Sequence, residues 1–317
     1  MTNELHGDQA FRSDSLLGRQ PEMTYGGALS FLRRRYTREI TAADVVVSGI
    51  PFDAATTNRP GARFGPAAIR AASTQLAELE AFPWGFDPFD HLAVADYGDC
   101  FLDPGYPDEV AEHIEAHARG ILAQAPGMLT FGGDHFVTYP LLRAHAERHG
   151  PLALLQFDAH PDTWSDDGRR LDHGTMFRRA VDEGVIDPEH SIQVGIRTHA
   201  PAAGITVLDA PWVHANGVQA TLDRIRATVG AHRTYLTFDI DCLDPAYAPG
   251  TGTPVPGGLT SAQALAVLRA LGDLDLVGMD VVEVAPAYDA AGITALAAAT
   301  LAHDYLCLLA DRRRREA

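Results

Sequence analysis

Eight short apolar runs constrain the fold of this chain more than any other feature of its sequence. Each run is rich in valine, isoleucine, leucine and phenylalanine, which is typical of a strand buried on both faces. The runs occupy residues 44–50, 92–95, 128–131, 152–157, 192–196, 206–208, 235–240 and 276–282. Stretches with helical periodicity lie between most of them, at 66–79, 107–122, 139–148, 261–271 and 294–309. This alternation predicts a mostly parallel sheet with helices on both faces.

The length and composition of the chain favour one large domain. Its 317 residues are 46% hydrophobic and 21% charged, so the chain can bury a sizeable core. No internal repeat and no linker rich in proline, glycine or serine divides the sequence. Residues 1–43 are polar and irregular, and we expect an N-terminal arm there, before a single domain at 44–317. Such an arm is either a loose tail or an element that packs on a neighbouring subunit.

Charge and cysteine content exclude several classes of protein. A formal charge of −17 would repel a phosphate backbone, and only the short arginine runs at 33–35 and 312–315 oppose it, so we expect no nucleic-acid partner. The three widely spaced cysteines suit a reducing compartment. Residues 1–25 lack the apolar segment of a signal peptide, and no later apolar run approaches the roughly 20 residues that span a bilayer. The sequence therefore predicts a soluble, cytoplasmic protein without a membrane partner.

Four polar clusters each fall where a predicted strand ends. They occupy residues 132–135, 157–162, 238–241 and 280–283. In open α/β sheets, ligands bind at the carboxyl ends of the strands, so all four clusters can converge on one crevice. We expect the paired glycines Gly132 and Gly133 to form a tight turn that positions His135.

The spacing within these clusters indicates a metal centre. Side chains alternate across a strand, so Asp158, His160 and Asp162 can point the same way, as can Asp239 and Asp241. A single aspartate at a strand end is usually a helix cap or turn former. Four carboxylates gathered with two imidazoles, however, would repel one another and lose solvation unless cations lay between them.

Two divalent ions satisfy this requirement. Oxygen-dominated ligation with some imidazole suits manganese better than a closed structural zinc site, while nickel, cobalt and iron remain alternatives. Two such ions about 3.5–4 Å apart can share a water and lower its pKa toward neutrality, which predicts hydrolysis.

At these residues the chain resembles the ureohydrolase family of arginases and agmatinases, and most of all its agmatinase members. The resemblance rests on residues 48–53, 63–70, 132–135, 157–160, 172–177 and 238–258. It implies a three-layer αβα sandwich around an eight-stranded, mostly parallel sheet, assembled into a homo-oligomer, either a trimer or a hexamer. It also implies two Mn²⁺ ions per subunit, with Ni²⁺ or Co²⁺ as substitutes.

The same resemblance implies roles for individual residues. The metal ligands would be His135, Asp158, His160, Asp162, Asp239 and Asp241, with Asp158 and Asp239 bridging the two ions. Asp162 would also take a proton from the attacking water, and His173 would exchange protons with solvent. Glu283 would pair with the guanidinium group of the substrate.

The substrate is expected to be agmatine, cleaved to urea and putrescine, because the resemblance to agmatinases extends beyond the shared metal motifs. Within the loop 163–172, Asp166 or Asp167 could attract the ammonium group of agmatine. Arg169 or Arg170 could instead pair with the carboxylate of guanidinobutyrate, and all four could simply be solvated loop charges. A hypothesis of another class is a metal-binding partner protein that has lost catalysis.

Overall fold

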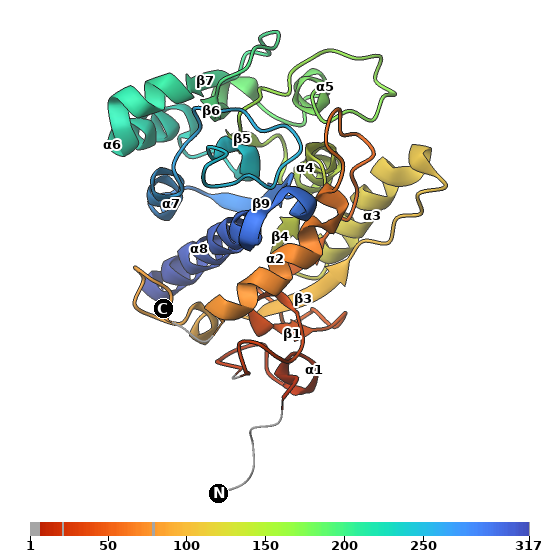
Figure 1. The fold of residues 1–317 in the computed structure, drawn as a ribbon, viewed down its shortest axis with the longest axis vertical. Coiled ribbons are helices and arrows are strands. Elements are labelled where there is room, and N and C mark those ends of the chain that lie inside the picture. Colours follow the sequence, from red (N-terminus) through yellow and green to blue (C-terminus); the bar gives the residue numbers. More distant parts are fainter. Residues whose placement is uncertain (1–6, 21, 78–79, 317) are drawn as a thin grey trace, which may run out of the picture.

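The structure, a computed structural model, describes residues 7–20, 22–77 and 80–316 and is built on a nine-stranded sheet (Figure 1). The strands are β1 (Arg35–Tyr36), β2 (Val45–Gly49), β3 (Val94–Asp99), β4 (Gly127–Phe131), β5 (Ala153–Phe157), β6 (Ile192–Ile196), β7 (Thr206–Asp209), β8 (Thr234–Asp239) and β9 (Leu276–Val282). They lie in the order β1-β3-β2-β4-β9-β8-β5-β6-β7, and every neighbouring pair described is parallel.

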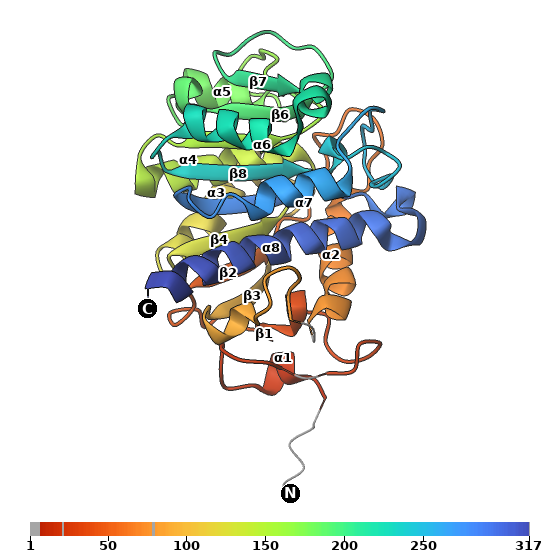
Figure 2. The same cartoon turned by 90° about the vertical axis from the view of Figure 1, so that its left-hand side faces the viewer.

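The α-helices form a layer on each face of this sheet (Figure 2). They are α1 (Gln9–Arg12), α2 (Gly65–Ser73), α3 (Val110–Leu122), α4 (Thr138–His149), α5 (Met176–Asp182), α6 (Ala210–Val229), α7 (Ser261–Arg269) and α8 (Ile293–Glu316). Helices α2, α6, α7 and α8 pack against one another in one layer, and α3, α4 and α5 do so in the other. The predicted αβα sandwich is therefore confirmed, with one strand more than the eight expected.

Alternation along the buried strands divides the core into two. In β2, Val45 and Val47 belong to the hydrophobic cluster under α2, α7 and α8, whereas Val46 belongs to the cluster under α3 and α4. Because both faces are covered, each strand is largely apolar, which is why the eight runs were visible in the sequence.

The predicted helices differ from the structure in several places. Helix α5 was not predicted, and α8 continues beyond the predicted end at residue 309 to Glu316. Helix α6 was missed because Gly217 interrupts its periodicity, with φ of 79° and ψ of −179° inside the helix. The helix predicted at 66–79 ends at Ser73, because the hydroxyls of Ser73 and Thr74 donate to the carbonyls of Arg70 and Ala71 and close the last turn. The last two predicted residues, 78 and 79, lie outside the described part of the chain.

The segment predicted as an N-terminal arm contributes directly to the domain. Phe31 and Leu32 are fully buried in the core, and β1 pairs with β3 as the ninth strand. Arg33 and Arg34 are also buried, with guanidinium groups that donate to backbone carbonyls, such as that of Gly18. This part of the predicted basic run therefore fills polar positions inside the protein. The boundary at residue 44 stays a prediction, and residues 1–6 are not described.

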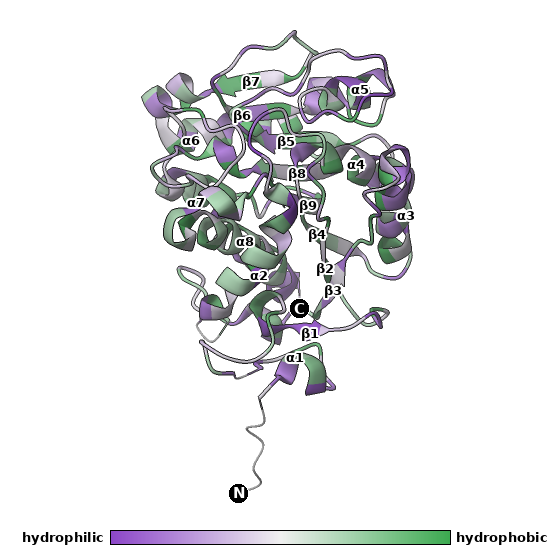
Figure 3. Ribbon diagram, turned by 45° about the vertical axis from the view of Figure 1, so that its right-hand side comes forward, coloured by the Kyte–Doolittle hydropathy of each residue, from purple (hydrophilic) through white to green (hydrophobic). Residues whose placement is uncertain are grey.

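Helix α8 corrects the expectation that no apolar segment approaches the length of a membrane span. The helical segment Ala290–Glu316 contains an 18-residue window with a mean hydropathy of 1.5, and Figure 3 shows α8 as largely hydrophobic. However, 72% of that window is buried inside the protein, as in a core helix. The alanines that raise its hydropathy pack closely against α2 and α7.

Gly132 and Gly133 lie where neighbouring segments approach the backbone too closely to admit a Cβ. Neither has a positive φ, so the expected tight turn is not what requires glycine. A Cβ on Gly133 would lie 1.5 Å from the carbonyl oxygen of Phe52, and one on Gly132 would lie 2.5 Å from Cγ1 of Val282. Positions 132 and 133 can therefore carry no side chain.

We predict that Gly133→Ala destabilises the protein by about 3 kcal/mol or more, since the 50–53 segment must move to admit the methyl group. The melting temperature should fall by about 4–5 °C or more in a thermal unfolding scan. The matched control is Gly120→Ala in α3, where nothing lies within 4 Å of the added Cβ. That change should be neutral or stabilising by up to about 1 kcal/mol. Equal melting temperatures for both variants would contradict this account.

Candidate active site

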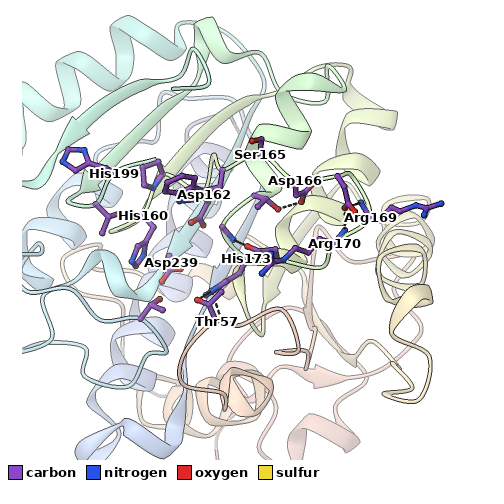
Figure 4. Close-up of a pocket in the computed structure, with 18 residues that line it drawn as sticks. Thr57, His160, Asp162, Ser165, Asp166, Arg169, Arg170, His173, His199 and Asp239 are labelled. Atoms are coloured by element: carbon purple, nitrogen blue, oxygen red, sulfur yellow. Dashed lines mark hydrogen bonds and ion pairs between the residues drawn. The ribbon is translucent and has the colours of Figure 1, made fainter. Parts of the chain in front are cut away.

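All six predicted ligands meet at the carboxyl ends of three parallel strands. His135 follows β4, Asp158 with His160 and Asp162 follows β5, and Asp239 ends β8 two residues before Asp241. The carboxyl ends of parallel strands share one edge of the sheet, so residues about 100 positions apart become neighbours there. Figure 4 shows His160, Asp162 and Asp239 facing the same hollow.

The ligands form two overlapping groups that share Asp158. The first contains His135, Asp158 and Asp162, and the second contains Asp158, His160 and Asp241, with the ligand atoms of each group within 4.8 Å of one another. Asp239 completes the first group, since its Oδ2 lies 3.2 Å from Nδ1 of His135. Two groups that share a carboxylate are the arrangement expected for two ions with a common bridge.

The tautomer of His135 shows that the first group requires a cation. Nε2 of His135 lies 2.9 Å from Oγ1 of Thr237, whose own proton goes to Asp280 at 2.6 Å, so Nε2 must be the donor. Nδ1 then carries a lone pair in the neutral ring. This buried Nδ1 has no hydrogen-bond partner of proper geometry, yet it lies 3.0, 3.1 and 3.2 Å from oxygens of Asp158, Asp162 and Asp239. A lone pair facing three carboxylates is repulsive unless a positive ion lies between them.

The pKa directions within the cluster agree with this conclusion. Burial, followed by the charge of Asp158, raises the pKa of Asp162 to about 7. Burial, followed by the charges of Asp241 and Asp158, raises the pKa of Asp239 well above its usual range. Burial alone would lower the pKa of His135, but its carboxylate neighbours raise it well above its usual value. These directions favour positive charge among the carboxylates, which divalent cations would supply.

A row of buried polar residues supports the ligands from beneath. Thr237 pairs in register with Asp280 of β9 and with Gln156 of β5, and the row continues to other strands. Its members, from β2 to β6, are Ser48, Thr130, Asp280, Thr237, Gln156 and Gln193, and all are essentially inaccessible to solvent.

Hydrogen bonds from part of this row reach the predicted ligands. The side-chain amide of Gln156 donates to Oδ2 of Asp158 at 2.7 Å, and that of Gln193 donates to Gln156 at 2.6 Å. Asp280 also accepts hydrogen bonds from Thr138 and Tyr235. Such partners set the direction and basicity of a metal ligand, so the row fixes the site to the rigid sheet.

The sequence analysis missed this row, although a signal for it was present. Gln156 and Thr237 are polar residues inside otherwise apolar runs, each two positions before a predicted ligand. A spacing of two places them on the same face of the strand as Asp158 and Asp239. Only the register of the sheet, however, aligns them with Asp280 and Gln193.

His173 and Glu283 lie against each other beside the predicted metal ligands. Nδ1 of His173 donates to Oε1 of Glu283 at 2.8 Å, and this oxygen also accepts the backbone N–H of His135 at 2.9 Å. The backbone N–H of Thr57 donates to Nε2 of His173 at 3.1 Å. The other oxygen of Glu283, Oε2, is buried without a partner, and the residue has a φ of 63°. A buried, unpaired carboxylate oxygen is available to a hydrogen-bond donor.

His173 has a partner in either protonation state. The neutral ring accepts from the N–H of Thr57, and a protonated ring could donate to the Thr57 hydroxyl, whose oxygen lies 2.8 Å from the same nitrogen. Burial lowers the pKa of His173, but the hydrogen bond and charge of Glu283 outweigh it and raise the pKa to about 9. This environment suits a group that accepts and releases a proton.

The ligands open into a cavity of about 810 Å³. Its walls include His160, Asp162, Asp239 and His173 at the base, and Trp164 near the mouth, where that side chain is 54% exposed. Figure 4 shows the loop 163–172 closing one side, with Asp166, Arg169 and Arg170 on it. The cavity is large enough for a small extended molecule whose one end reaches the ligands.

The four loop charges considered as substrate contacts, Asp166, Asp167, Arg169 and Arg170, differ in their surroundings. Asp166 is fully engaged, because Oδ2 accepts from Thr175 and pairs with Arg179 at 2.7 Å while Oδ1 accepts from Gly168. Burial raises the pKa of Asp166, but those contacts outweigh it and lower the pKa.

The other three loop charges are exposed. Oδ1 of Asp167 accepts the N–H groups of Arg169 and Arg170 in a local turn. The guanidinium of Arg170 pairs with Asp172 at 2.8 Å and is 66% exposed. All three line the cavity, and their roles as substrate-binding residues stay predictions.

Comparison with known proteins agrees with the geometry. Residues 43–307 match the model of the Arginase family. An agmatinase from Chromobacterium violaceum is 61% identical over 99% of this chain and 98% of its own. The crystal structure of a hypothetical agmatinase from Burkholderia thailandensis superposes with a TM-score of 0.97 at 60% identity and covers 99% of both chains. Proclavaminate amidino hydrolase from Streptomyces clavuligerus superposes with a TM-score of 0.88 at 42% identity, over 92% of this chain and all of its own.

We predict that Thr237→Val lowers the affinity of the His135 group for its metal by about 10–100-fold, since Nε2 of His135 and Asp280 both lose the partner that orients them. Competition with a fluorescent chelator measures this affinity. Thr221→Val in α6 is the matched control, because it removes a buried hydroxyl that bonds only Gly217 at 2.9 Å. Metal affinity should be unchanged in that variant. If both variants bind metal like the unmodified protein, the support by Thr237 has no effect.

Proposed function

The chain belongs to the arginase family, and on this basis we propose that it hydrolyses agmatine to putrescine and urea at a centre of two metal ions. The observation that carries the proposal is the pair of ligand groups that share Asp158, with the lone pair of His135 facing three carboxylates. The agmatinase relatives, which match over nearly the full length, support the choice of substrate. The cavity beside the predicted ligands is lined by His160, Asp162 and Asp239, so a substrate bound there would reach the proposed metal centre.

The metal centre, when filled, would supply Lewis acidity and an activated water. His135, Asp158, Asp162 and Asp239 would hold one ion, and Asp158, Asp239, His160 and Asp241 the other. We propose Mn²⁺ for both, because carboxylate oxygens outnumber imidazole nitrogens, with Ni²⁺ or Co²⁺ as substitutes.

The remaining residues would position the substrate and move protons. The unpaired Oε2 of Glu283 would accept a hydrogen bond from the planar guanidinium and hold its carbon toward the ligands. Asp162, which lies beside His135 among the predicted ligands, would take the proton of the attacking water. His173, with a partner in either state, would carry protons between the base of the cavity and solvent.

The far end of the substrate would lie near the loop 163–172. The carboxylate of Asp166 already pairs with Arg179 and accepts a hydrogen bond from Thr175, so we propose that it stabilises the conformation of the loop. Asp167 is the freer carboxylate and would attract the ammonium of agmatine, opposed by Arg169. If the arginines dominate, guanidinobutyrate or another guanidino acid becomes the better substrate, and the likeness to an amidino hydrolase that is not an agmatinase favours retaining this alternative.

We further propose a cytoplasmic homo-oligomer, either a trimer or a hexamer, as in the family. The alternative of an inactive metal-binding protein is disfavoured by the preserved contacts around His173 and Glu283. A protein without catalysis has no need for a buried carboxylate oxygen that lacks a partner.

A substrate panel tests the function. Protein loaded with Mn²⁺ or Ni²⁺ is assayed for urea with agmatine, guanidinobutyrate, guanidinopropionate, arginine and guanidine. We expect agmatine to give the highest kcat/KM and Mn²⁺ to give the greater activity. Preference for a guanidino acid would transfer the function to that substrate, and the lack of urea with every compound would support the inactive alternative.

We predict that Glu283→Gln lowers kcat/KM by tens to hundreds of fold, or about 2–4 kcal/mol, because the charge that pairs with guanidinium is lost. Glutamine keeps the shape and one oxygen for His173 and His135, so both metals and the melting temperature should be retained. Glu115→Gln is the matched control, as Glu115 is a buried glutamate in ion pairs with Arg119 and Arg143. It should leave kcat/KM unchanged. A Glu283→Gln enzyme that is fully active, or that loses its metals, would refute the assigned role.

A further inference from the structure

We propose that Arg197 is a positioning residue that holds Asp241 in place for one of the two metal ions, an inference that rests on the proposed two-metal function. Arg197 directly follows β6, whereas Asp158 and His160 follow β5 and Asp241 follows β8. In the sheet, β5 lies between β6 and β8. The side chain of Arg197 therefore reaches past one ligand-bearing strand end to another.

The main chain of Arg197 is attached to the ligand segment that follows β5. Its backbone N–H donates to the carbonyl of Ala159 at 2.9 Å, and Ala159 lies between the ligands Asp158 and His160. The backbone N–H of Ala159 in turn donates to Oδ1 of Asp241 at 3.1 Å. One end of Arg197 is thus fixed to the segment that supplies two members of the second ligand group.

The guanidinium of Arg197 is attached to the ligand segment that follows β8. Nη2 donates to the carbonyl of Asp241 at 2.6 Å and to that of Val255 at 2.7 Å. The other hydrogen bonds of the guanidinium go to the carbonyls of residues 195, 242, 243 and, from Nε, again 255. Each acceptor described is a backbone carbonyl. The planar arrangement of the N–H groups therefore fixes the path of the backbone around Asp241.

The bonds to Val255 extend this support to the carboxylate of Asp241. Val255 lies two residues after Thr253, whose hydroxyl donates to Oδ2 of Asp241 at 3.3 Å. The same oxygen lies 3.1 Å from Nδ1 of His160, the imidazole of the second ligand group. Arg197 therefore sets Asp241 from two sides, through its carbonyl directly and through its carboxylate by way of the 253–255 segment. Partners of this kind set the direction of a metal ligand.

The two ligand groups have separate supports. Thr237 orients His135 in the first group from within the sheet, and Arg197 holds Asp241 of the second group from the end of β6. The guanidinium is also closely enclosed, since a Cβ on Gly258 would lie 2.7 Å from its Nη2. Lysine, with a single nitrogen, cannot reproduce hydrogen bonds from three nitrogens to this set of carbonyls.

The test compares the two stepwise dissociation constants for Mn²⁺, measured by competition with a fluorescent chelator and without substrate. We expect Arg197→Lys to weaken one ion by about 10–100-fold and to leave the other within about twofold. Lysine keeps the positive charge, so the comparison isolates the loss of the planar hydrogen-bonding group.

Combination with Thr237→Val identifies the ion. Because Thr237 supports the first group, the double variant Arg197→Lys, Thr237→Val should bind both ions more weakly, each by the factor seen in its own single variant. If one ion takes the whole loss in the double variant, both residues act on the same group, which would overturn the inference.

Arg148→Lys is the matched control, because Arg148 near the end of α4 also donates to backbone carbonyls, those of Leu122 and Ala125. It should lower the melting temperature and change neither dissociation constant. The same behaviour in Arg197→Lys would show a purely structural arginine and overturn the inference.

A second variant covers the case in which Arg197→Lys does not fold. Thr253→Val removes only the hydroxyl that reaches Asp241 and should weaken the same ion by about tenfold. Unchanged constants in this variant would also count against the inference. If the unmodified protein binds fewer than two Mn²⁺ ions, the proposed two-metal function fails together with the inference, so the two failures are distinguishable.

Discussion

The burial of uncompensated negative charge at one edge of the sheet is the constraint on which the rest of the structure depends. Asp158, Asp162, Asp239 and Asp241 are held together in a region that water hardly reaches. Their mutual repulsion cannot be relieved by movement, since each follows a strand fixed in a parallel sheet. Positive charge must come from outside the chain, and two metal ions with a shared ligand supply it in the least space.

The sheet can hold these carboxylates together because the strand residues next to them are partly polar. The polar row that includes Gln156, Thr237 and Asp280 links neighbouring strands through side-chain hydrogen bonds. A buried polar network is stable only when its groups are satisfied, and here the members that touch the ligands have their partners. The row therefore fixes the side-chain orientations of His135 and Asp158 to the sheet, which is more rigid than any loop.

The charges that we propose to read the far end of the substrate, in contrast, lie on a loop. Hydrogen bonds from the sheet fix the predicted ligands at the strand ends. The loop 163–172, by comparison, carries exposed charges whose contacts are mostly with one another. Asp166 is the exception, because its pair with Arg179 of α5 ties the loop to a helix. Members of one family can thus keep a common metal centre and read different substrates by changing this loop.

The sequence by itself determined the architecture and the predicted metal ligands. Strands buried on both faces are largely apolar, which made the runs visible, and parallel strands bring residues such as His135 and Asp239 to one edge. It did not reveal α6, where Gly217 breaks the periodicity, or the ninth strand, which is only two residues long. Only the tertiary structure decided that Thr237 and Asp280 support His135 and that Asp166 is already paired. These facts depend on the register between strands and on the packing of distant loops, and neither is encoded in any local stretch of sequence.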